Sequence, residues 1–247
     1  EQLFREYPYF SSFSDTVLQS ANALVDRLVA TRRLDGHSSV IEVASNDGYL
    51  LQYYQQRGIA VLGIEPAVNV ARVAQEQRGI STLCEFFDRE VAQRLAAQGL
   101  RADVVHANNV LAHVSDINDF LNGVVAGLQT LLKHEGLAVI EVPYVKDLIE
   151  RCEFDTIYHE HLCYFSVTAL DCLVRRHALV IQDVEHLPIH GGSLRLFLMN
   201  EASAQQSPAV RTFLEEEAAW GVNDIEVYRG FARRVEHVKR SLRSTLL

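Results

Sequence analysis

The chain is poor in several features, and each scarcity disfavours a class of protein. It has only 4 cysteines in 247 residues, with no C-x-x-C spacing, so we expect reduced thiols rather than a zinc site or a disulfide framework. No apolar run reaches the roughly 20 residues of a transmembrane helix, and no stretch resembles a signal peptide. We therefore expect a cytoplasmic protein with no membrane partner. The single methionine is Met199 and the chain starts at Glu1, so we also expect a processed chain or an excised fragment.

Positive charge is scarce as well. Lys and Arg number 23 against 32 Asp and Glu, which gives a formal net charge of -9. Nucleic-acid binding favours clustered basic residues, so we expect no nucleic-acid partner. Hydrophobic residues make up 48% and charged residues 22%, as in an ordinary globular protein, and the length suits one large domain with an appendage.

Hydrophobic periodicity predicts alternating strands and helices over most of the chain. Predicted strands are 40–43, 61–64, 81–84, 103–107 and 137–142, and predicted helices are 17–28, 49–57, 68–78, 88–98 and 118–132. Ser14 is the expected N-cap of the first helix, and Gly79 is expected to stop the third. This alternation predicts an α/β fold, a parallel sheet with right-handed crossovers and helices on both faces.

The end of the chain breaks this rhythm. The strand-like runs 179–186 and 193–199 are joined by a connection so short that they must pair antiparallel, and helices are predicted at 210–220 and 227–247. A mostly parallel sheet with a terminal antiparallel hairpin looks like the class I methyltransferase fold, which is Rossmann-like. A plain dinucleotide dehydrogenase would more often continue with a parallel strand.

The first predicted strand leads into a turn of small residues, Val40-Ile-Glu-Val-Ala-Ser-Asn-Asp-Gly48. The stretch replaces a Glu-x-Gly-x-Gly-x-Gly loop, with Ala44 and Asn46 where the first two glycines would stand. Such a loop, which begins at Glu42 and keeps Gly48, suits a small adenosyl ligand better than a pyrophosphate.

Glu65 ends the second predicted strand, close to the roughly 20-residue spacing at which an acidic side chain meets ribose hydroxyls. A carboxylate there also opposes a 2′-phosphate, which disfavours NADP. The alternative is an exposed carboxylate in a turn.

Other polar and aromatic residues follow the third and fourth predicted strands. Phe86 or Phe87 could cover an adenine, and Asp88 could accept from its amine, although a core phenylalanine and a helix cap are the alternatives. Asn108 and Asn109 could bind a ligand's amino and carboxylate groups, or could form a local Asx turn. His113 lies nearby, but a single histidine is more often packed or solvated.

The stretch from Phe154 to Phe165 is dense in reactive side chains. Tyr158, His159, Glu160 and His161 supply an acid, two possible bases and a carboxylate. One interpretation is proton transfer, in which a histidine takes a proton from substrate carbon while a tyrosine hydroxyl stabilises the enolate oxygen. The alternatives are a metal site of His159 and His161 with a third ligand such as His190, or a hydrogen-bonded loop without chemistry.

The hairpin connection His190-Gly191-Gly192 allows two interpretations. It could be a turn alone, or a close approach of the backbone to a ligand.

Together these stretches resemble the nucleotide-sugar C-methyltransferases of antibiotic deoxysugar pathways, which methylate carbon 3 of a dTDP-4-keto-deoxysugar. The substituted glycine loop and the Tyr-His-Glu-His run are the most diagnostic. The matching stretches are residues 7–15, 42–51, 63–66, 107–113, 154–161 and 190–195.

The resemblance implies a small-molecule acceptor, a dTDP-keto-sugar, and S-adenosyl-L-methionine (SAM) as methyl donor, with S-adenosylhomocysteine (SAH) as product. It also implies that His161 is the general base, that Tyr158 assists at the keto oxygen, that Glu160 orients the sugar or the base, and that Tyr9 closes over the site. No metal is implied at the chemistry. The predicted donor-binding residues are Glu42, Ala44, Asn46, Gly48, Tyr49, Glu65, Pro66, Phe87, Asp88, Asn108 and Asn109.

The resemblance also has departures. Family members carry an N-terminal zinc-binding domain and a further C-terminal domain, and neither is complete in this chain. We expect a helical cap with the Tyr-Pro-Tyr-Phe motif at 1–35, a SAM-binding domain at 36–200 and a helical tail at 201–247 that leads into missing sequence. The alternatives in function are an O- or N-methyltransferase for another small molecule, an NAD-dependent oxidoreductase, or a non-catalytic adenosyl-binding module.

Overall fold

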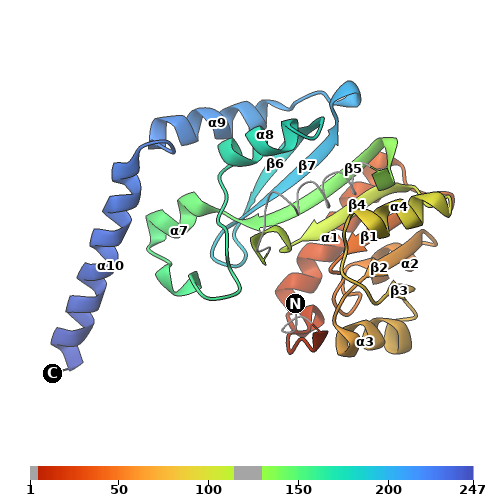
Figure 1. Ribbon diagram of the computed structural model, residues 1–247, viewed down its shortest axis with the longest axis horizontal. Coiled ribbons are helices and arrows are strands. Elements are labelled where there is room, and N and C mark those ends of the chain that lie inside the picture. Colours follow the sequence, from red (N-terminus) through yellow and green to blue (C-terminus); the bar gives the residue numbers. More distant parts are fainter. Residues whose placement is uncertain (1–4, 114–129, 247) are drawn as a thin grey trace. The chain divides into compact units, whose positions relative to one another are not determined.

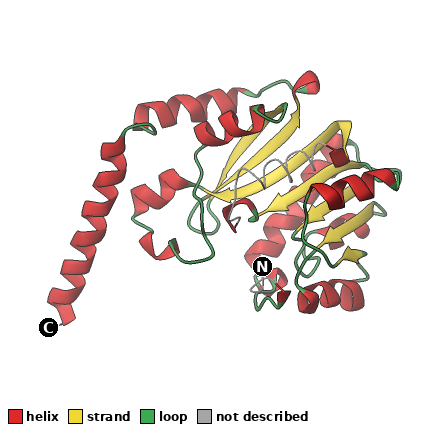
Figure 2. Ribbon diagram, in the orientation of Figure 1, coloured by secondary structure: helices red, strands yellow, loops and turns green. Residues whose placement is uncertain are grey.

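The computed structural model describes residues 5–113 and 130–246. It contains a seven-stranded sheet with the strand order β3-β2-β1-β4-β5-β7-β6 (Figures 1 and 2). The chain divides into two compact units, Glu1–Val110 with Asp116–Ile140, and Leu111–Ser115 with Glu141–Leu247. Strand β5 (Leu132–Pro143) contributes residues to both units. In the described part of the chain, no helix is both long enough and apolar enough to cross a membrane.

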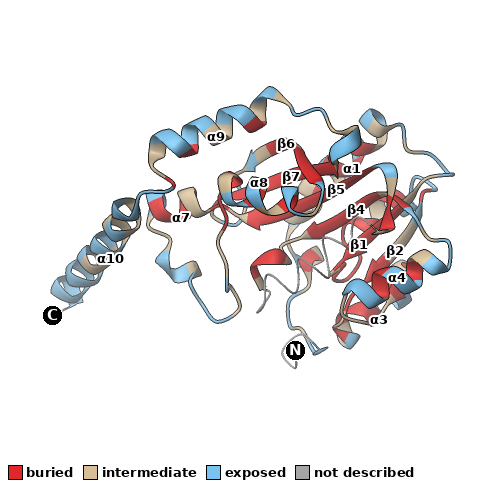
Figure 3. Ribbon diagram, turned by 45° about the horizontal axis from the view of Figure 1, so that its top comes forward, coloured by how far each residue is buried: buried red, intermediate tan, exposed pale blue. Residues whose placement is uncertain are grey.

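The first unit holds the parallel strands. Its strands are β1 (Ser39–Val43), β2 (Ala60–Ile64), β3 (Thr82–Leu83) and β4 (Ala102–Asn108), and its helices are α1 (Asp15–Arg32), α2 (Leu51–Gln55), α3 (Val68–Arg78) and α4 (Arg89–Ala97). β1 pairs in parallel with both β2 and β4, and β2 pairs in parallel with β3. The central strands are buried along most of their length, as expected where helices cover a parallel sheet (Figure 3).

Local signals set the helix ends of this unit. Ser14 Oγ accepts a hydrogen bond from the amide of Val17 at 3.4 Å, which caps α1. α3 ends at Gly79, whose φ of 66° is left-handed, a conformation that glycine adopts without steric cost. Both predictions are confirmed.

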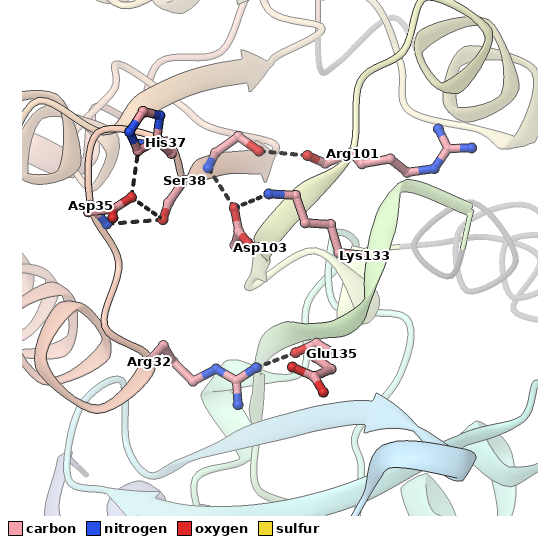
Figure 4. A network of polar contacts seen from close by, with 9 residues as sticks. Arg32, Asp35, His37, Ser38, Arg101, Asp103, Lys133 and Glu135 are labelled. Carbon is pink, nitrogen blue, oxygen red and sulfur yellow. Dashed lines mark hydrogen bonds and ion pairs between the residues drawn. The ribbon is translucent and has the colours of Figure 1, made fainter.

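A polar network joins the amino-terminal ends of the strands in the first unit (Figure 4). Asp103 accepts from the Ser39 amide at 2.8 Å and pairs with Lys133 Nζ at 2.7 Å, so β1, β4 and β5 are tied together there. Ser39 Oγ donates to the carbonyl of Arg101 at 2.6 Å. These contacts lie at the edge opposite to the strand ends from which the predicted site residues emerge.

The second unit ends in the predicted antiparallel hairpin. Its hairpin strands are β6 (Leu179–Leu187) and β7 (Ser193–Asn200), and its helices are α7 (Val145–Arg151), α8 (Val167–Arg175), α9 (Pro208–Trp220) and α10 (Ile225–Leu246). The pairing runs from Leu179 opposite Asn200 to Leu187 opposite Ser193, with a shift in register between Ile181 and Asp183. The α/β class and the antiparallel hairpin are therefore confirmed.

Glu217 of α9 is fully buried and forms hydrogen bonds to the first residues of α8. Its carboxylate accepts from the amides of Val167 at 2.7 Å and Thr168 at 2.8 Å, and from Thr168 Oγ1 at 2.5 Å. These donors include backbone amides that the first turn of a helix leaves unsatisfied. A buried carboxylate is tolerated here because hydrogen bonds compensate its charge.

Several predicted boundaries differ from the structure. The helix expected at 49–57 is the shorter α2, because the left-handed Gly48 is followed by turns before the helix begins. Leu132, expected to end a helix, begins β5 instead, beside the Lys133 ion pair to Asp103. Most of that expected helix, 118–129, lies outside the described residues. α7 and α8 were not predicted.

Candidate functional site

The loop after β1 uses left-handed backbone at alternate residues. Ala44, Asn46 and Gly48 have φ values of 52°, 50° and 76°. The turn closes with a hydrogen bond from the Gly48 amide to the Ser45 carbonyl at 3.0 Å, and the Ser45 amide donates to Ile64 at 3.2 Å. Glycine adopts this conformation at the least cost, so the two substituted positions keep the geometry of a glycine loop with non-glycine residues.

Glu65 lies directly against this loop. Its Oε2 accepts from the amide of Asn46 and its Oε1 from the amide of Ala67, both at 2.9 Å. The side chain is 5% exposed, and burial raises its pKa while the two amide hydrogen bonds oppose that shift. The carboxylate is therefore no exposed turn residue, and it retains lone pairs beyond the two already used.

The side chain of Asn46 holds the N-terminal segment. Its Oδ1 accepts from the amide of Ser11 at 2.8 Å, and its Nδ2 donates to the carbonyl of Tyr9 at 3.1 Å. Asn69 of α3 repeats the arrangement on Tyr7, with distances of 3.0 Å to its amide and 2.8 Å to its carbonyl. The Tyr-Pro-Tyr-Phe motif is thereby fixed in the first unit, and Tyr9 remains 45% exposed.

Asp47 extends the same attachment. Its Oδ2 accepts from Ser12 Oγ at 2.5 Å and pairs with Arg78 Nη2 at 3.2 Å, and the residue is 1% exposed. Asp47, Asn69 and Arg78 were not predicted as site residues. Asp47 lies in the loop after β1, and Asn69 and Arg78 lie in α3. No spacing rule links these positions to the N-terminal segment.

The remaining predicted donor-binding residues also belong to the first unit. Asp88 caps α4 by accepting from the amide of Val91 at 2.8 Å, which is the helix-cap alternative. Phe87 is partly exposed. Asn108 ends β4 and Asn109 follows it, and Asn108 Oδ1 is a buried acceptor with no hydrogen-bond partner among the described residues. Asn109 has a φ of 56°, so the backbone turns sharply after the strand.

The flanking residues Tyr49 and Pro66 follow the loop and Glu65. Tyr49 is 8% exposed, and its carbonyl accepts from the side chain of Gln52 at 2.8 Å. Pro66 precedes the start of α3. Glu42 is 1% exposed on β1. Tyr49 and Pro66 thus lie next to Gly48 and Glu65, which shape the loop.

In the second unit, Tyr158 and His161 form a hydroxyl–imidazole pair. The distance from Tyr158 Oη to His161 Nε2 is 3.0 Å, and His161 Nδ1 lies 3.0 Å from the carbonyl of Thr156. A carbonyl oxygen only accepts, so Nδ1 must carry the proton of that hydrogen bond. In neutral His161 the unprotonated nitrogen is then Nε2, which faces the tyrosine hydroxyl.

His113 is a functional candidate, although its position in the sequence marks it only as a single histidine. Its ring lies 5.1 Å from the ring of His161, centroid to centroid. Burial, and then the neighbouring His161, lower the pKa of His113, which favours a neutral ring. The amide of Leu162 donates to the carbonyl of Ala112 at 2.8 Å, so the two segments are also joined through backbone.

Glu160 and His159 are arranged differently from the His161 pair. His159 is exposed, and its Nε2 lies 3.7 Å from Glu160 Oε1. Among the described residues no three His, Cys, Asp or Glu side chains are grouped to hold a metal ion. The alternative metal site of His159, His161 and His190 therefore finds no ligand set in that part of the chain.

The Gly191-Gly192 turn is packed against carboxylates. A Cβ on Gly192, whose φ is 122°, would lie 1.8 Å from Asp147 Oδ2. The Gly192 carbonyl accepts from the amide of Tyr144 at 3.0 Å, and Asp147 Oδ2 lies 2.5 Å from His186 Nε2. The glycines thus permit close approach of the hairpin to α7.

The chain matches two family models. One, described as a methyltransferase domain, covers residues 15–183, and the other, described as a C-methyltransferase C-terminal domain, covers residues 188–247. A similar protein is the C-methyltransferase NovU of Streptomyces niveus, with 38% identity over 98% of this chain and 56% of the relative. The chain thus spans little more than half of that relative's length.

Solved structures share the fold. Magnesium protoporphyrin IX methyltransferase from Synechocystis PCC 6803, with bound SAH, has a TM-score of 0.57 and 15% identity over 73% of this chain and 82% of that one. The PH0226 protein of Pyrococcus horikoshii OT3 has a TM-score of 0.60 and 13% identity over 81% of this chain and 99% of that one. These similarities confirm the predicted class I methyltransferase fold.

Proposed function

This chain belongs to the methyltransferase domain family, and we propose that it is a SAM-dependent C-methyltransferase that acts next to a ketone. The single observation that carries the proposal is the fixed imidazole of His161 beside the hydroxyl of Tyr158. The acceptor is a small molecule, a dTDP-4-keto-deoxysugar methylated at carbon 3. The C-methyltransferase name of the relative supports carbon as the site of transfer.

The residues of the first unit fit a methyl donor. When bound, SAM supplies an electrophilic methyl group on a sulfonium centre. Glu65 has lone pairs for ribose hydroxyls, and the buried Oδ1 of Asn108 can accept from a ligand's amino group. At Gly48, whose φ is 76°, a Cβ would meet the Ile80 side chain at 3.0 Å, so any side chain there would be strained and tightly packed. Glu42, Ala44, Asn46, Tyr49, Pro66, Phe87, Asp88 and Asn109 complete the proposed donor-binding set.

His161 is the proposed general base. The Thr156 carbonyl holds the proton on Nδ1, so Nε2 accepts from the Tyr158 hydroxyl in the free protein. Once that hydroxyl donates to the ketone oxygen instead, Nε2 is the nitrogen that can take a proton from the substrate carbon. The ketone acidifies that carbon–hydrogen bond, and the proton moves to Nε2 while the electron pair moves onto the ketone oxygen. With SAM bound, the electron pair of the enolate would form the new carbon–carbon bond to the methyl group, and the methyl–sulfur bond would break to leave SAH.

Tyr158 is the proposed stabiliser of the enolate oxygen. Burial and the charge of Glu160 raise its pKa, so the hydroxyl keeps its proton near neutral pH and can donate to a developing negative charge. Glu160 orients the sugar or the base, and Tyr9 closes over the bound molecules. The helical cap at 1–35, the SAM-binding domain at 36–200 and the helical tail at 201–247 remain our proposed division, with the cytoplasm as the proposed location.

The decisive experiment separates proton abstraction from methyl transfer. A panel of dTDP-4-keto-deoxysugars is incubated with protein and SAH in deuterated solvent, and exchange of the carbon-bound hydrogen is followed by NMR. His161→Asn is expected to lose both exchange and methylation, whereas Tyr158→Phe is expected to slow both and leave SAM affinity unchanged. Methylation by His161→Asn at the wild-type rate would refute the base assignment. Calorimetry with SAM, SAH and NAD tests the donor, and tight NAD binding without SAM binding would refute the proposal.

A further inference from the structure

A buried row of polar side chains crosses the first unit directly beneath the Ala44–Gly48 loop. Its centre is Glu42 of β1, which is 1% exposed. The register places Gly63 of β2 on one side of Glu42 and His106 of β4 on the other. Neighbouring strands are about 4.8 Å apart, and register partners in parallel strands present their side chains on the same face. Since Gly63 has no side chain, His106 is the strand neighbour that faces Glu42.

His106 is itself held from the helix layer. It is 0% exposed, and its Nε2 lies 3.0 Å from the hydroxyl of Tyr54, a fully buried residue of α2. The two rings lie 5.7 Å apart, centroid to centroid. Tyr54 therefore holds the imidazole, which by register is the neighbour of Glu42 on the same face of the sheet.

The space over Gly63 is filled from the loop. A Cβ on Gly63 would lie 2.4 Å from Ser45 Oγ, so the serine side chain occupies the place of the missing one. Ser45 is 0% exposed, and its hydroxyl has no hydrogen-bond partner among the described residues. On the face of the sheet that carries Glu42, a hydroxyl thus stands on one side of the carboxylate and an imidazole on the other.

A buried carboxylate must be compensated, and this arrangement supplies the groups that can do so. Glu42 lies in β1, two residues before the Ala44–Gly48 loop, and Ser45 lies within that loop, so the carboxylate is connected to the loop through the end of the strand. We propose that His106 is a positioning residue: held by Tyr54, it fixes the carboxylate of Glu42, and through it the loop that receives the cationic methyl donor. This inference deepens the proposed function and rests on it for the identity of the ligand.

Three variants and a control test the inference by calorimetry with SAH. His106→Leu removes the polar ring beside Glu42, and we expect SAH binding to weaken by about tenfold or more, because the buried carboxylate loses a polar neighbour that compensates its charge. His106→Asn keeps an N–H group near the position of Nδ1, and we expect it to rescue affinity to within about threefold. Tyr54→Phe is expected to fall between these two.

Asp103→Asn is the matched control, because Asp103 lies on the same strand at the opposite edge of the sheet. It is expected to lower the melting temperature and leave SAH affinity unchanged. Wild-type affinity in His106→Leu would overturn the inference, as would an equal loss in His106→Leu and His106→Asn at matched melting temperatures.

A second measurement needs neither ligand binding nor a folded leucine variant. In protein labelled with ¹⁵N-histidine, the His106 ring resonances are assigned by their absence in His106→Asn. Glu42→Gln is expected to shift these resonances in the ligand-free protein, and unchanged resonances would overturn the inference. If wild-type protein binds neither SAM nor SAH, the proposed function fails, while the ¹⁵N measurement still decides whether His106 and Glu42 are coupled.

Discussion

Replacing Asn46 tests why the loop carries an asparagine in place of a glycine. Its side chain makes two hydrogen bonds to the N-terminal segment, to the Ser11 amide and the Tyr9 carbonyl. Each is worth about 1 kcal/mol net. Alanine would lose both bonds and would also sit in left-handed backbone, at a further cost of about 1 kcal/mol. We therefore expect Asn46→Ala to lower the free energy of unfolding by about 3 kcal/mol.

Glycine separates the two contributions. Asn46→Gly loses the same bonds but removes the backbone strain, so we expect a loss of about 2 kcal/mol. Asn69→Ala is the matched variant, because Asn69 binds Tyr7 with two hydrogen bonds from ordinary helical backbone. Its expected loss is about 1.5 kcal/mol, since alanine gains about 0.5 kcal/mol in helix propensity. Combining the Asn69 and Asn46 variants should cost less than the sum, because both side chains restrain one segment.

Urea denaturation measures these free energies, and chymotrypsin reports where the loss occurs. Tyr9, Phe10 and Phe13 offer cleavage sites in the restrained segment, and its local opening should raise the cleavage rate there before the rest of the protein unfolds. The reasoning is refuted if Asn46→Ala and Asn46→Gly are equally stable, or if neither variant is cleaved faster than wild type in this segment.

Three further predictions test other parts of the structure. Glu217→Ala should lower the free energy of unfolding by about 3 kcal/mol, because the donors of Val167 and Thr168 lose a buried acceptor. Urea denaturation followed by circular dichroism measures this loss, and a value below about 1 kcal/mol would contradict the prediction. Gly192→Ala should lower the free energy of unfolding by about 2 kcal/mol or more, because the new Cβ would overlap the Asp147 side chain. An unchanged melting temperature would contradict this prediction. Burial raises the pKa of Glu65, so its stabilising contribution is complete below the ordinary value of 4.5 and is lost as pH rises through the folded-state pKa. The stability difference between wild type and Glu65→Gln should therefore fall as pH rises above 4.5, and a difference that grows in urea titrations across that range would contradict the sign.

Most of the fold could be predicted from the sequence because its signals are local. The bounds of α3 follow from helical periodicity and Gly79, and the cap of α1 follows from Ser14. The antiparallel hairpin follows from the short connection through Gly191 and Gly192. α7 was missed because seven residues between a strand and a loop give too little periodicity to distinguish a helix from a buried strand.

Contacts within the candidate site could be predicted where the residues are close in sequence, as for Tyr158 and His161, or where they follow adjacent strands, as for Asn46 and Glu65. Tyr158 and His161 are three positions apart in the sequence, so a contact between their side chains could be expected from sequence alone. The atom that fixes the tautomer is the backbone carbonyl of Thr156, which no residue pattern marks. His113 reaches His161 from a segment 48 positions earlier by residue number, and such a contact depends on the path of the chain between strands.

The two non-glycine residues of the loop are accommodated in different ways. Asn46 lies in left-handed backbone, which asparagine tolerates better than most residues, and its side chain adds two hydrogen bonds that offset the remaining cost. Ala44 has no polar side chain that could form such hydrogen bonds. The cost of its left-handed backbone must therefore be offset by contacts of the neighbouring residues. The neighbouring groups include Glu65, which accepts from the Asn46 amide, and the buried Glu42 of β1, two residues before Ala44. A strained loop persists only where neighbours over-determine its shape, and the polar groups around it do so here.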